Sequence, residues 1–493
     1  MLTESEIKKF IADDLASTKK RLAGIGQRYY EGEHDILKNR LFYFNADGNL
    51  VEDKTRSNVK ISHPFFTELT EQISAYMLSF DENPIRAKET AESETAAELQ
   101  EQLDLYFDDE FWAEIGDLIE DAYSKGFGYI YGYKNENDKL VFECADSMGI
   151  VEVRASDTDS KSEHIIFHYV DRIEKGKKVV KKIQVWDKEQ VYFYVQNGTN
   201  SKIEIDNDIE VNPRPHVVFT EEESGQKMGY PLGYIPFWRL DNNKKQFSGL
   251  KPIKALIDDY DIMMCGLSNN LADFDTPLHV VKGFEGDNLD ELQQNLKTKK
   301  LIGTDAEGGV EVKTVDIPYE ARKTKAEIDE KNIYRFGMGL NTNGLKDTSA
   351  TTNIAIKAAY SLLDMKANKL EKRLKKLLKE IILVVLDEIN EEMKTGYSIS
   401  DIYFDFDRAL LTNESENIAN KKIEAETKQI KINTILNIAV NIGDEQTLKA
   451  ICEEMEWDFE SLKTQVEQFK STGAADAQKL LDAVNPESDD VNE

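Results

Sequence analysis

The chain has 493 residues, and its 62 Lys and Arg against 93 Asp and Glu give a formal net charge of −31. This length suggests two to four domains, and a hydrophobic fraction of 40% is enough to form real cores. A protein that grips DNA should carry a basic face, so the charge argues against tight nucleic-acid binding and equally fits an acidic cytoplasmic protein.

Cysteine usage predicts a protein of a reducing compartment, and hydropathy predicts that the chain does not span a membrane. Cys144, Cys265 and Cys452 lie far apart and form no CxxC pair, which argues against a disulfide framework. The N-terminal stretch MLTESEIKKF has no apolar core, so we expect no signal peptide. No apolar run reaches the ~18–20 residues needed to span a bilayer.

The N-terminal quarter of the chain is predicted to be mainly helical. Thr3 and Glu6 have the spacing of a capping box. Asp47-Gly48 predicts a tight turn between two short apolar runs. Helices are predicted over 3–31, 64–80 and 98–124, with a solvated stretch at 86–98.

At Gly126-Phe-Gly128 the pattern changes from helices to strands, and about 95 residues follow that are rich in β-branched and aromatic residues. The runs alternate or are continuously apolar, and Gly, Asn and Asp separate them. This is long enough for a sheet domain. The predicted strands are YIYGYKN, KLVFECA, IVEVRAS, HIIFHYVDRI, KKIQVWD, VYFYVQNG and HVVFTEE.

The region from Lys251 to about Met393 organises the rest of the chain. Two helical segments, 250–274 with Pro252 in its first turn and 319–336, flank an insertion that is predicted to be strand, helix and strand. A polar Gly- and Thr-rich loop then leads into a helix from Asn353 to about Met393. At ~1.5 Å rise per residue this helix would span roughly 60 Å, so it is expected to cross between domains or line an assembly. Its apolar positions are Leu370, Leu374, Leu377, Leu378, Ile381, Val385 and Ile389.

The C-terminal part is predicted to hold a short strand and more helices. Ser400–Asp407 alternates as a strand that returns to the β-rich region or elsewhere within residues 1–249. Helices are expected over 413–441 and 444–470, and the acidic end PESDDVNE is expected to be disordered.

This order of elements resembles the portal proteins of tailed bacteriophages, over about residues 5–460. Four stretches resemble the portal family found in phages of Gram-positive bacteria. They are YYEGEHDI (29–36), HPFFTELTEQISAYMLS (63–79), NNKKQFSGLKPIKALIDDYDIMMCGLSNNLADF (242–274) and TNIAIKAAYSLLDMKANKLEKRLKKLL (352–378).

The resemblance implies an α+β portal fold with an α/β wing, a two-helix stem, a small α/β clip, a long helix and an α-helical crown. The implied layout is wing 1–249, stem helix 250–275, clip 276–318, second stem helix 319–339, tunnel loop 340–352, long helix 353–395, wing strand 396–412, crown 413–470 and acidic tail 471–493.

The resemblance also implies a function without catalysis or cofactor. Such a protein forms a ring, a dodecamer in the family, at one vertex of the capsid. Double-stranded DNA is packaged through the ring by a terminase and later ejected into the tail. The implied partners are DNA, the terminase, the head-tail connector, and the major capsid and scaffolding proteins. The implied location is the virion, with the host cytoplasm during assembly. A mostly negative channel would let DNA slip, because a tight ionic grip would stall it.

Two groups of residues are expected to face the channel if the resemblance holds. The tunnel-loop group is Asn341, Asn343, Lys346, Asp347 and Thr348. The stem group is Arg322, Lys323 and Lys325, which could instead pair with Glu320, Glu327 and Asp329; the i,i+4 spacing of Lys323 and Glu327 favours pairing. Most lysines between Lys366 and Lys379 are expected to form the solvated face of the long helix.

Other chemistry has weaker support in the sequence. Asp405 and Asp407 could hold a divalent cation, and His164 with His168 could hold zinc, but each pair lacks further ligands nearby and fits an ordinary strand face. No phosphate-binding loop of the form GxxxxGK[ST] is present, so ATP hydrolysis is not expected. A coiled-coil scaffold or adaptor built on the long helix is the alternative function, and a nuclease would need a carboxylate cluster that we do not find.

Overall fold

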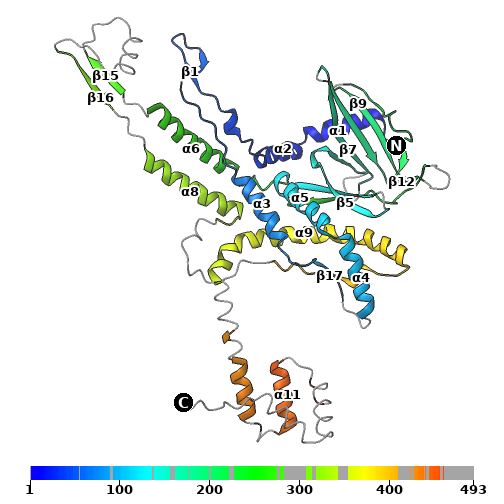
Figure 1. Cartoon of the computed structure of the whole chain (residues 1–493). Coiled ribbons are helices and arrows are strands. Elements are labelled where there is room, and N and C mark those ends of the chain that lie inside the picture. Colours follow the sequence, from blue (N-terminus) through cyan, green and yellow to red (C-terminus); the bar gives the residue numbers. More distant parts are fainter. Residues whose placement is uncertain are drawn as a thin grey trace, which may run out of the picture. The chain divides into compact units, whose positions relative to one another are not determined.

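The computed structural model describes residues 2–54, 56–88, 93–135, 138–155, 162–176, 178–198, 201–220, 227–274, 278–282, 307–313, 318–341, 353–408, 422–423, 427–437, 439, 443–455, 459 and 463. The chain divides into two compact units (Figure 1). Unit 1 comprises Met1–Asp347 and Ala359–Ala409, and unit 2 comprises Thr348–Ala358 and Leu410–Glu493. The described elements combine helices and antiparallel sheets, as in an α+β fold.

Unit 1 begins with two helices, α1 (Glu4–Ala16) and α2 (Thr18–Tyr30), where the sequence predicted one over 3–31. That prediction was wrong at Ser17. Ser17 has an extended backbone, and its hydroxyl accepts a hydrogen bond from the Lys20 N–H at 3.2 Å, so it caps α2 instead of continuing α1. The capping box of Thr3 and Glu6 is confirmed.

A short 3₁₀ helix (Asp35–Lys38) leads to a two-stranded ribbon of β1 (Phe42–Phe44) and β2 (Leu50–Glu52). The turn predicted at Asp47-Gly48 is confirmed, because Gly48 adopts φ 78°, which glycine tolerates best. All six strand residues are exposed.

Three helices follow: α3 (Phe65–Met77), α4 (Ser93–Tyr106) and α5 (Asp109–Lys125). The single helix predicted over 98–124 is therefore two helices. Asp108 separates them, because its carboxylate accepts from the Phe111 N–H at 3.0 Å and caps α5.

The predicted β-rich region forms antiparallel sheets. A three-stranded sheet has the order β14-β4-β5, a larger sheet has the order β10-β9-β8-β7-β6 with β11 also paired to β9, and β12 pairs with β13. Helix α1 buries Ile7 on the larger sheet, and α2 buries Ala23 against residues of both. The strands are β4 (Phe127–Lys134), β5 (Leu140–Ala145), β6 (Ile150–Val153), β7 (His164–Glu174), β8 (Lys178–Trp186), β9 (Gln190–Asn197), β10 (Ile203–Ile205), β11 (Arg214–Pro215), β12 (Val217–Thr220), β13 (Lys227–Tyr230) and β14 (Phe237–Asp241).

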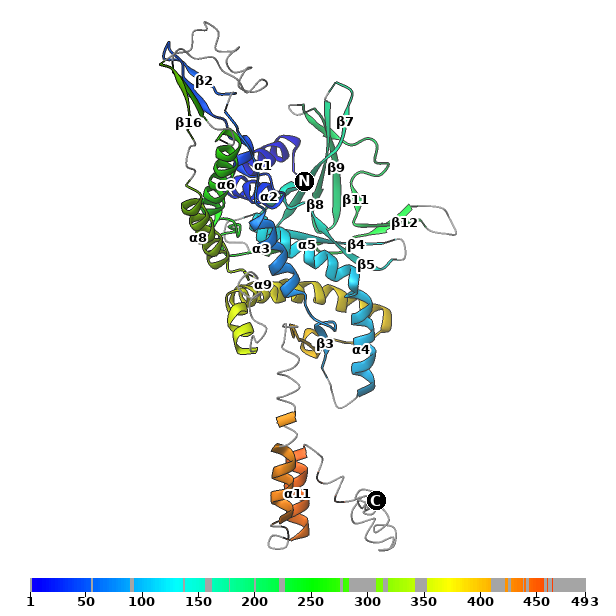
Figure 2. The ribbon, with the colours of Figure 1, turned by 60° about the vertical axis from the view of Figure 1, so that its left-hand side comes forward.

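Helices α6 (Lys254–Phe274) and α8 (Tyr319–Gly337) lie side by side in both views (Figures 1 and 2). Pro252 precedes α6 by two residues, so it lies in the preceding turn and not in the helix itself. Between the two helices in sequence come β15 (Leu278–Lys282) and β16 (Gly309–Lys313), which pair antiparallel. The helix predicted inside this insertion lies outside the described residues.

The long helix is confirmed as α9 (Asn353–Met393), with 41 residues. All seven apolar positions read from its sequence are buried, at 4% exposure or less. The predicted strand in 400–407 is β17 (Ile402–Phe404), which pairs with β3 (Ile85–Ala87). This pairing brings the chain after α9 back to the segment before α4.

Unit 2 contains α11 (Asp444–Met455) and a helical stretch over 427–437. The remainder of the helices predicted over 413–441 and 444–470, and the acidic tail, lie outside the described residues. Within the described part of the chain, no helix combines the length and apolar character needed to cross a membrane.

Candidate functional site

The side chain of Arg322 forms one of the links between helices α6 and α8. Its Nη1 donates a hydrogen bond to the carbonyl oxygen of Met263 at 3.2 Å. Gly266 makes room for this contact, because a Cβ there would lie 2.7 Å from Nη1. At least one N–H group of Arg322 is therefore already bound to the neighbouring helix.

Lys325 also reaches across the pair. Its Nζ contacts Asp259 of α6 at 2.5 Å and forms a second ion pair with Asp329 of α8. These two hydrogen bonds raise the pKa of Lys325. Lys323 is exposed, and its expected pair with Glu327 is not among the ion pairs of the described residues.

A buried carboxylate anchors α6 to the N-terminal segment. Asp261 accepts from His34 Nδ1 at 2.6 Å, and from both His63 Nδ1 at 2.7 Å and the His63 N–H at 3.0 Å. Asp261 and His34 are both 0% exposed. Burial raises the pKa of Asp261, but the hydrogen bonds from the two histidines outweigh it and hold the pKa below its ordinary value. No local sequence pattern indicates this cluster, because its members lie far apart in the chain.

The polar loop after α8 is described only at its first residues. Asn341 Nδ2 donates to Glu330 Oε1 at 3.4 Å. The other four residues expected to face a channel lie outside the described residues: Asn343, Lys346, Asp347 and Thr348.

One lysine of α9 differs from the solvated face that its neighbours form. Lys366 Nζ lies 3.2 Å from the carbonyl oxygen of Gly337 and 4.1 Å from the centre of the Tyr123 ring. Burial lowers the pKa of Lys366 to about 7. Lys375, in contrast, pairs with Glu371 at 2.7 Å.

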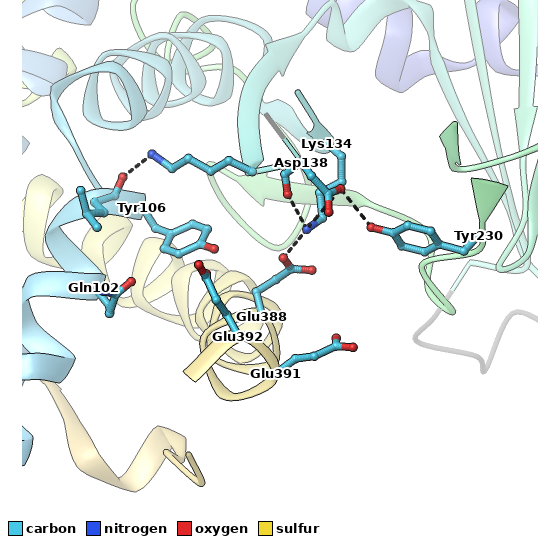
Figure 3. A pocket seen from close by; sticks show the side chains of 10 residues that line it. Gln102, Tyr106, Lys134, Asp138, Tyr230, Glu388, Glu391 and Glu392 are labelled. Atoms are coloured by element: carbon cyan, nitrogen blue, oxygen red, sulfur yellow. Dashed lines mark hydrogen bonds and ion pairs between the residues drawn. The ribbon is translucent and has the colours of Figure 1, made fainter. Parts of the chain in front are cut away.

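A pocket of about 900 Å³ lies among α4, the β4–β5 hairpin, β13 and the end of α9 (Figure 3). Lys134 pairs there with Glu388, and the Tyr230 hydroxyl donates to Asp138 Oδ1 at 3.2 Å. The lining residues include no Ser, Thr, Cys or His, and Lys134 is engaged by the Glu388 carboxylate. They are Gln102, Leu105, Tyr106, Lys134, Asp138, Lys139, Tyr230, Glu388, Glu391 and Glu392.

Within the described residues, neither pair considered as a metal site gains a third ligand. Asp405 and Asp407 are both exposed, and burial lowers the pKa of His168 to about 4. Among the described residues, no group of three or more His, Cys, Asp and Glu side chains is placed to hold a metal ion.

Comparisons with known proteins identify relatives over nearly the whole chain. The model of the family described as "Phage portal protein, SPP1 Gp6-like" matches residues 9–468. The chain is 24% identical to the portal protein of Bacillus phage SPP1 over 392 residues, which cover 79% of this chain and 75% of that protein. It is 24% identical to the portal protein of Clostridium phage phiCD119 over 440 residues, covering 85% of this chain and 91% of that protein. The family match thus includes every element from α2 to α11.

Proposed function

The chain belongs to the family of SPP1 Gp6-like phage portal proteins, and from this membership we propose that it assembles into a ring, of twelve copies, at one vertex of a capsid. Double-stranded DNA passes inward through the ring under the action of a terminase and later leaves through it into the tail. The observation that carries this proposal is the family match over residues 9–468, which includes the α6/α8 pair and α9 together.

The surface of unit 1 supports association with further copies. Large apolar side chains are exposed on α6, α8 and the β1–β2 ribbon, and such side chains in groups mark protein interfaces. The most exposed are Phe44 at 73%, Leu50 at 60%, Ile262 at 57%, Leu271 at 54% and Phe336 at 52%.

The helix pair supports a channel that does not grip DNA. We assign residues 250–275 and 319–339 to the stem, and Arg322, Lys323 and Lys325 to its channel side. Because Arg322 binds the Met263 carbonyl and Lys325 binds two carboxylates, Lys323 is the most available cation of the three. With the net charge of −31, this favours sliding over salt-dependent binding.

The remaining segments take roles in the same proposal. Residues 340–352 form the tunnel loop and adjust to passing DNA, with Asn341, Asn343, Lys346, Asp347 and Thr348 toward it. Residues 276–318 form the clip, where the terminase and then the head-tail connector dock. Wing and crown meet the major capsid and scaffolding proteins during assembly in the host cytoplasm.

The portal family is structural, and we propose that this chain works without catalysis. ATP hydrolysis belongs to the terminase, and the portal contributes the geometry of the bore. The coiled-coil alternative needs an apolar helix face that is open to a partner. Leu374, Ile381 and Val385 of α9 are instead fully buried within their own unit.

Negative-stain electron microscopy with mass photometry of the purified chain tests the proposal. Twelve chains of 56.3 kDa each give a ring of about 676 kDa with a central hole. Rings of another closed symmetry would correct the copy number only. A stable elongated dimer of about 113 kDa, with no ring even beside capsid and scaffolding proteins, would refute the ring.

A further inference from the structure

Residues 337–341 join α8 to the polar segment that follows, and their backbone is held in an uncommon form. Met338 adopts φ 55°, a left-handed conformation that few residues other than glycine take. The Gly339 N–H donates to the Tyr334 carbonyl at 2.9 Å and closes the last turn of α8. We call residues 337–341 the loop root.

The loop root lies directly against α3. A Cβ on Gly339 would lie 2.0 Å from Cδ2 of Leu69, and one on Gly337 would lie 2.7 Å from its Cδ1. Both glycines are buried. A side chain larger than hydrogen at Gly339 would therefore force either the fully buried Leu69 side chain or the root itself to shift.

A single side chain of α3 binds both backbone groups of Leu340. The Leu340 N–H donates to Gln72 Oε1, and Gln72 Nε2 donates to the Leu340 carbonyl, each at 2.9 Å. Leu340 is 8% exposed, so water has little access to its peptide groups, and the two bonds to Gln72 satisfy them instead. The glutamine amide acts here as a neighbouring strand would, by pairing with one donor and one acceptor.

Two further groups hold the other end of the root. The carbonyl oxygen of Gly337 receives the Tyr123 hydroxyl of α5 at 3.4 Å and Lys366 Nζ of α9 at 3.2 Å. Contacts from α3, α5 and α9 thus converge on residues that end α8. The described contacts fix the root to unit 1 from three helices.

We propose that Gln72 is a positioning residue that sets where the tunnel loop begins, by clamping Leu340 to α3. The inference rests on the proposed function, in which residues 340–352 face DNA. If the loop root is held in one place, the tunnel loop starts at the same position in every subunit of a ring. A frayed end of α8 would let this starting position vary between subunits. Gln72 needs no contact with DNA to do this.

Amide hydrogen exchange and DNA packaging, measured on the full chain, test the proposal. In Gln72→Ala, the Leu340 amide loses its acceptor, and its exchange rate should rise about tenfold or more. Gln72→Glu keeps an acceptor but loses the donor, so the exchange rate of the Leu340 amide in this variant should lie between those of the unsubstituted chain and Gln72→Ala. DNA packaging should fall as the Leu340 exchange rate rises, with several-fold fewer DNA-filled heads for Gln72→Ala than for the unsubstituted chain.

The chain contains a matched control in Gln100. Gln100 clamps β3 in the same way, because its Oε1 accepts from the Ala87 N–H at 2.8 Å and its Nε2 donates to the Ile85 carbonyl at 3.2 Å. Gln100→Ala loses these two backbone hydrogen bonds and the contact of Nε2 with Asp104 at 2.8 Å, just as Gln72→Ala also loses a contact of Nε2 with Glu68 at 3.2 Å. The Gln100 change does not touch the loop root. It should lower thermal stability about as much as Gln72→Ala, with unchanged Leu340 exchange and unchanged packaging.

Two results would overturn the proposal: unchanged Leu340 exchange in Gln72→Ala, or equal packaging defects in Gln72→Ala and Gln100→Ala. Failure of the proposed function would look different. In that case the unsubstituted chain would form no ring and support no packaging, while the exchange rates of Leu340 would still report on the clamp.

Discussion

Replacing Asp261 by Ala should destabilise unit 1 more than any change at an exposed carboxylate of α6. Asp261 is fully buried and accepts three hydrogen bonds, two from imidazoles and one from a backbone N–H. Alanine leaves all three donors without this acceptor, and one of them, on His34, is fully buried. Because the donors come from His34 and His63, the substitution also removes one of the links between α6 and the N-terminal segment.

The expected cost follows from the kind of contact that is lost. A hydrogen bond to a charged group contributes about 1.5–3 kcal/mol, and removing one partner of a buried pair costs about 3–5 kcal/mol. We expect a loss of about 4 kcal/mol in the free energy of unfolding of unit 1. A domain is stable by only about 5–15 kcal/mol, so this is a large fraction.

Urea unfolding followed by tryptophan fluorescence measures the loss. Trp112, Trp186 and Trp238 all lie in unit 1, and a Trp457→Phe background removes the signal from unit 2. Asp259→Ala is the matched control, since its carboxylate pairs with Lys325 in a partly exposed position. That variant should lose no more than about 1 kcal/mol.

The pH dependence has a defined sign. Since the folded pKa of Asp261 lies below its unfolded value of about 3.9, its contribution is fully present above that pH. It is lost as the pH falls through the folded pKa.

A cost below about 1 kcal/mol for Asp261→Ala would refute our account of the cluster, as would a cost equal to that of Asp259→Ala.

Three further predictions concern the long helix and the loop. Deleting 341–350 should leave ring assembly intact and impair DNA packaging; normal packaging would remove the loop from the mechanism. Leu374→Asp and Ile381→Asp each bury an unpaired charge and should prevent folding or assembly, whereas normal particles from both would show that α9 is not buried as described. Lys366→Met should raise the free energy of unfolding at and below pH 7, where the folded chain carries a buried ammonium. In the unsubstituted chain the cost of that buried charge is relieved as the pH rises from about 7 toward the unfolded pKa near 10.4. The same dependence of stability on pH in both chains would contradict the lowered pKa of Lys366.

The sequence predicted the elements whose signals are local and repeated. The span of α9 was readable because its apolar positions recur at helical spacing over many turns, and Thr3 with Glu6 identified a helix start by their spacing. The breaks at Ser17 and Asp108 were missed. In each case a short polar side chain in the middle of a periodic run turns to cap the following helix, and periodicity alone does not register that competition.

The contacts that define the candidate site were beyond sequence reasoning for a different reason. Gln72 and Leu340 are 268 positions apart, and His34 and Asp261 are 227 apart. Nothing in the residues around Gln72 marks it as different from any half-exposed glutamine of a helix. Only the packing of α8 against α3 creates the distance at which one amide can bind a peptide group twice.

The clamp between Gln72 and Leu340 and the ion pairs between α6 and α8 differ in how strongly they depend on salt. Lys325 and its carboxylates attract one another through charge, so dissolved ions weaken them. The clamp between Gln72 and Leu340 joins two neutral amides, which ionic strength hardly affects. Moving DNA carries a dense atmosphere of counterions with it. In the proposed ring, passing DNA would change the local salt, and the neutral clamp between Gln72 and Leu340 would respond to that change less than the ion pairs of Lys325.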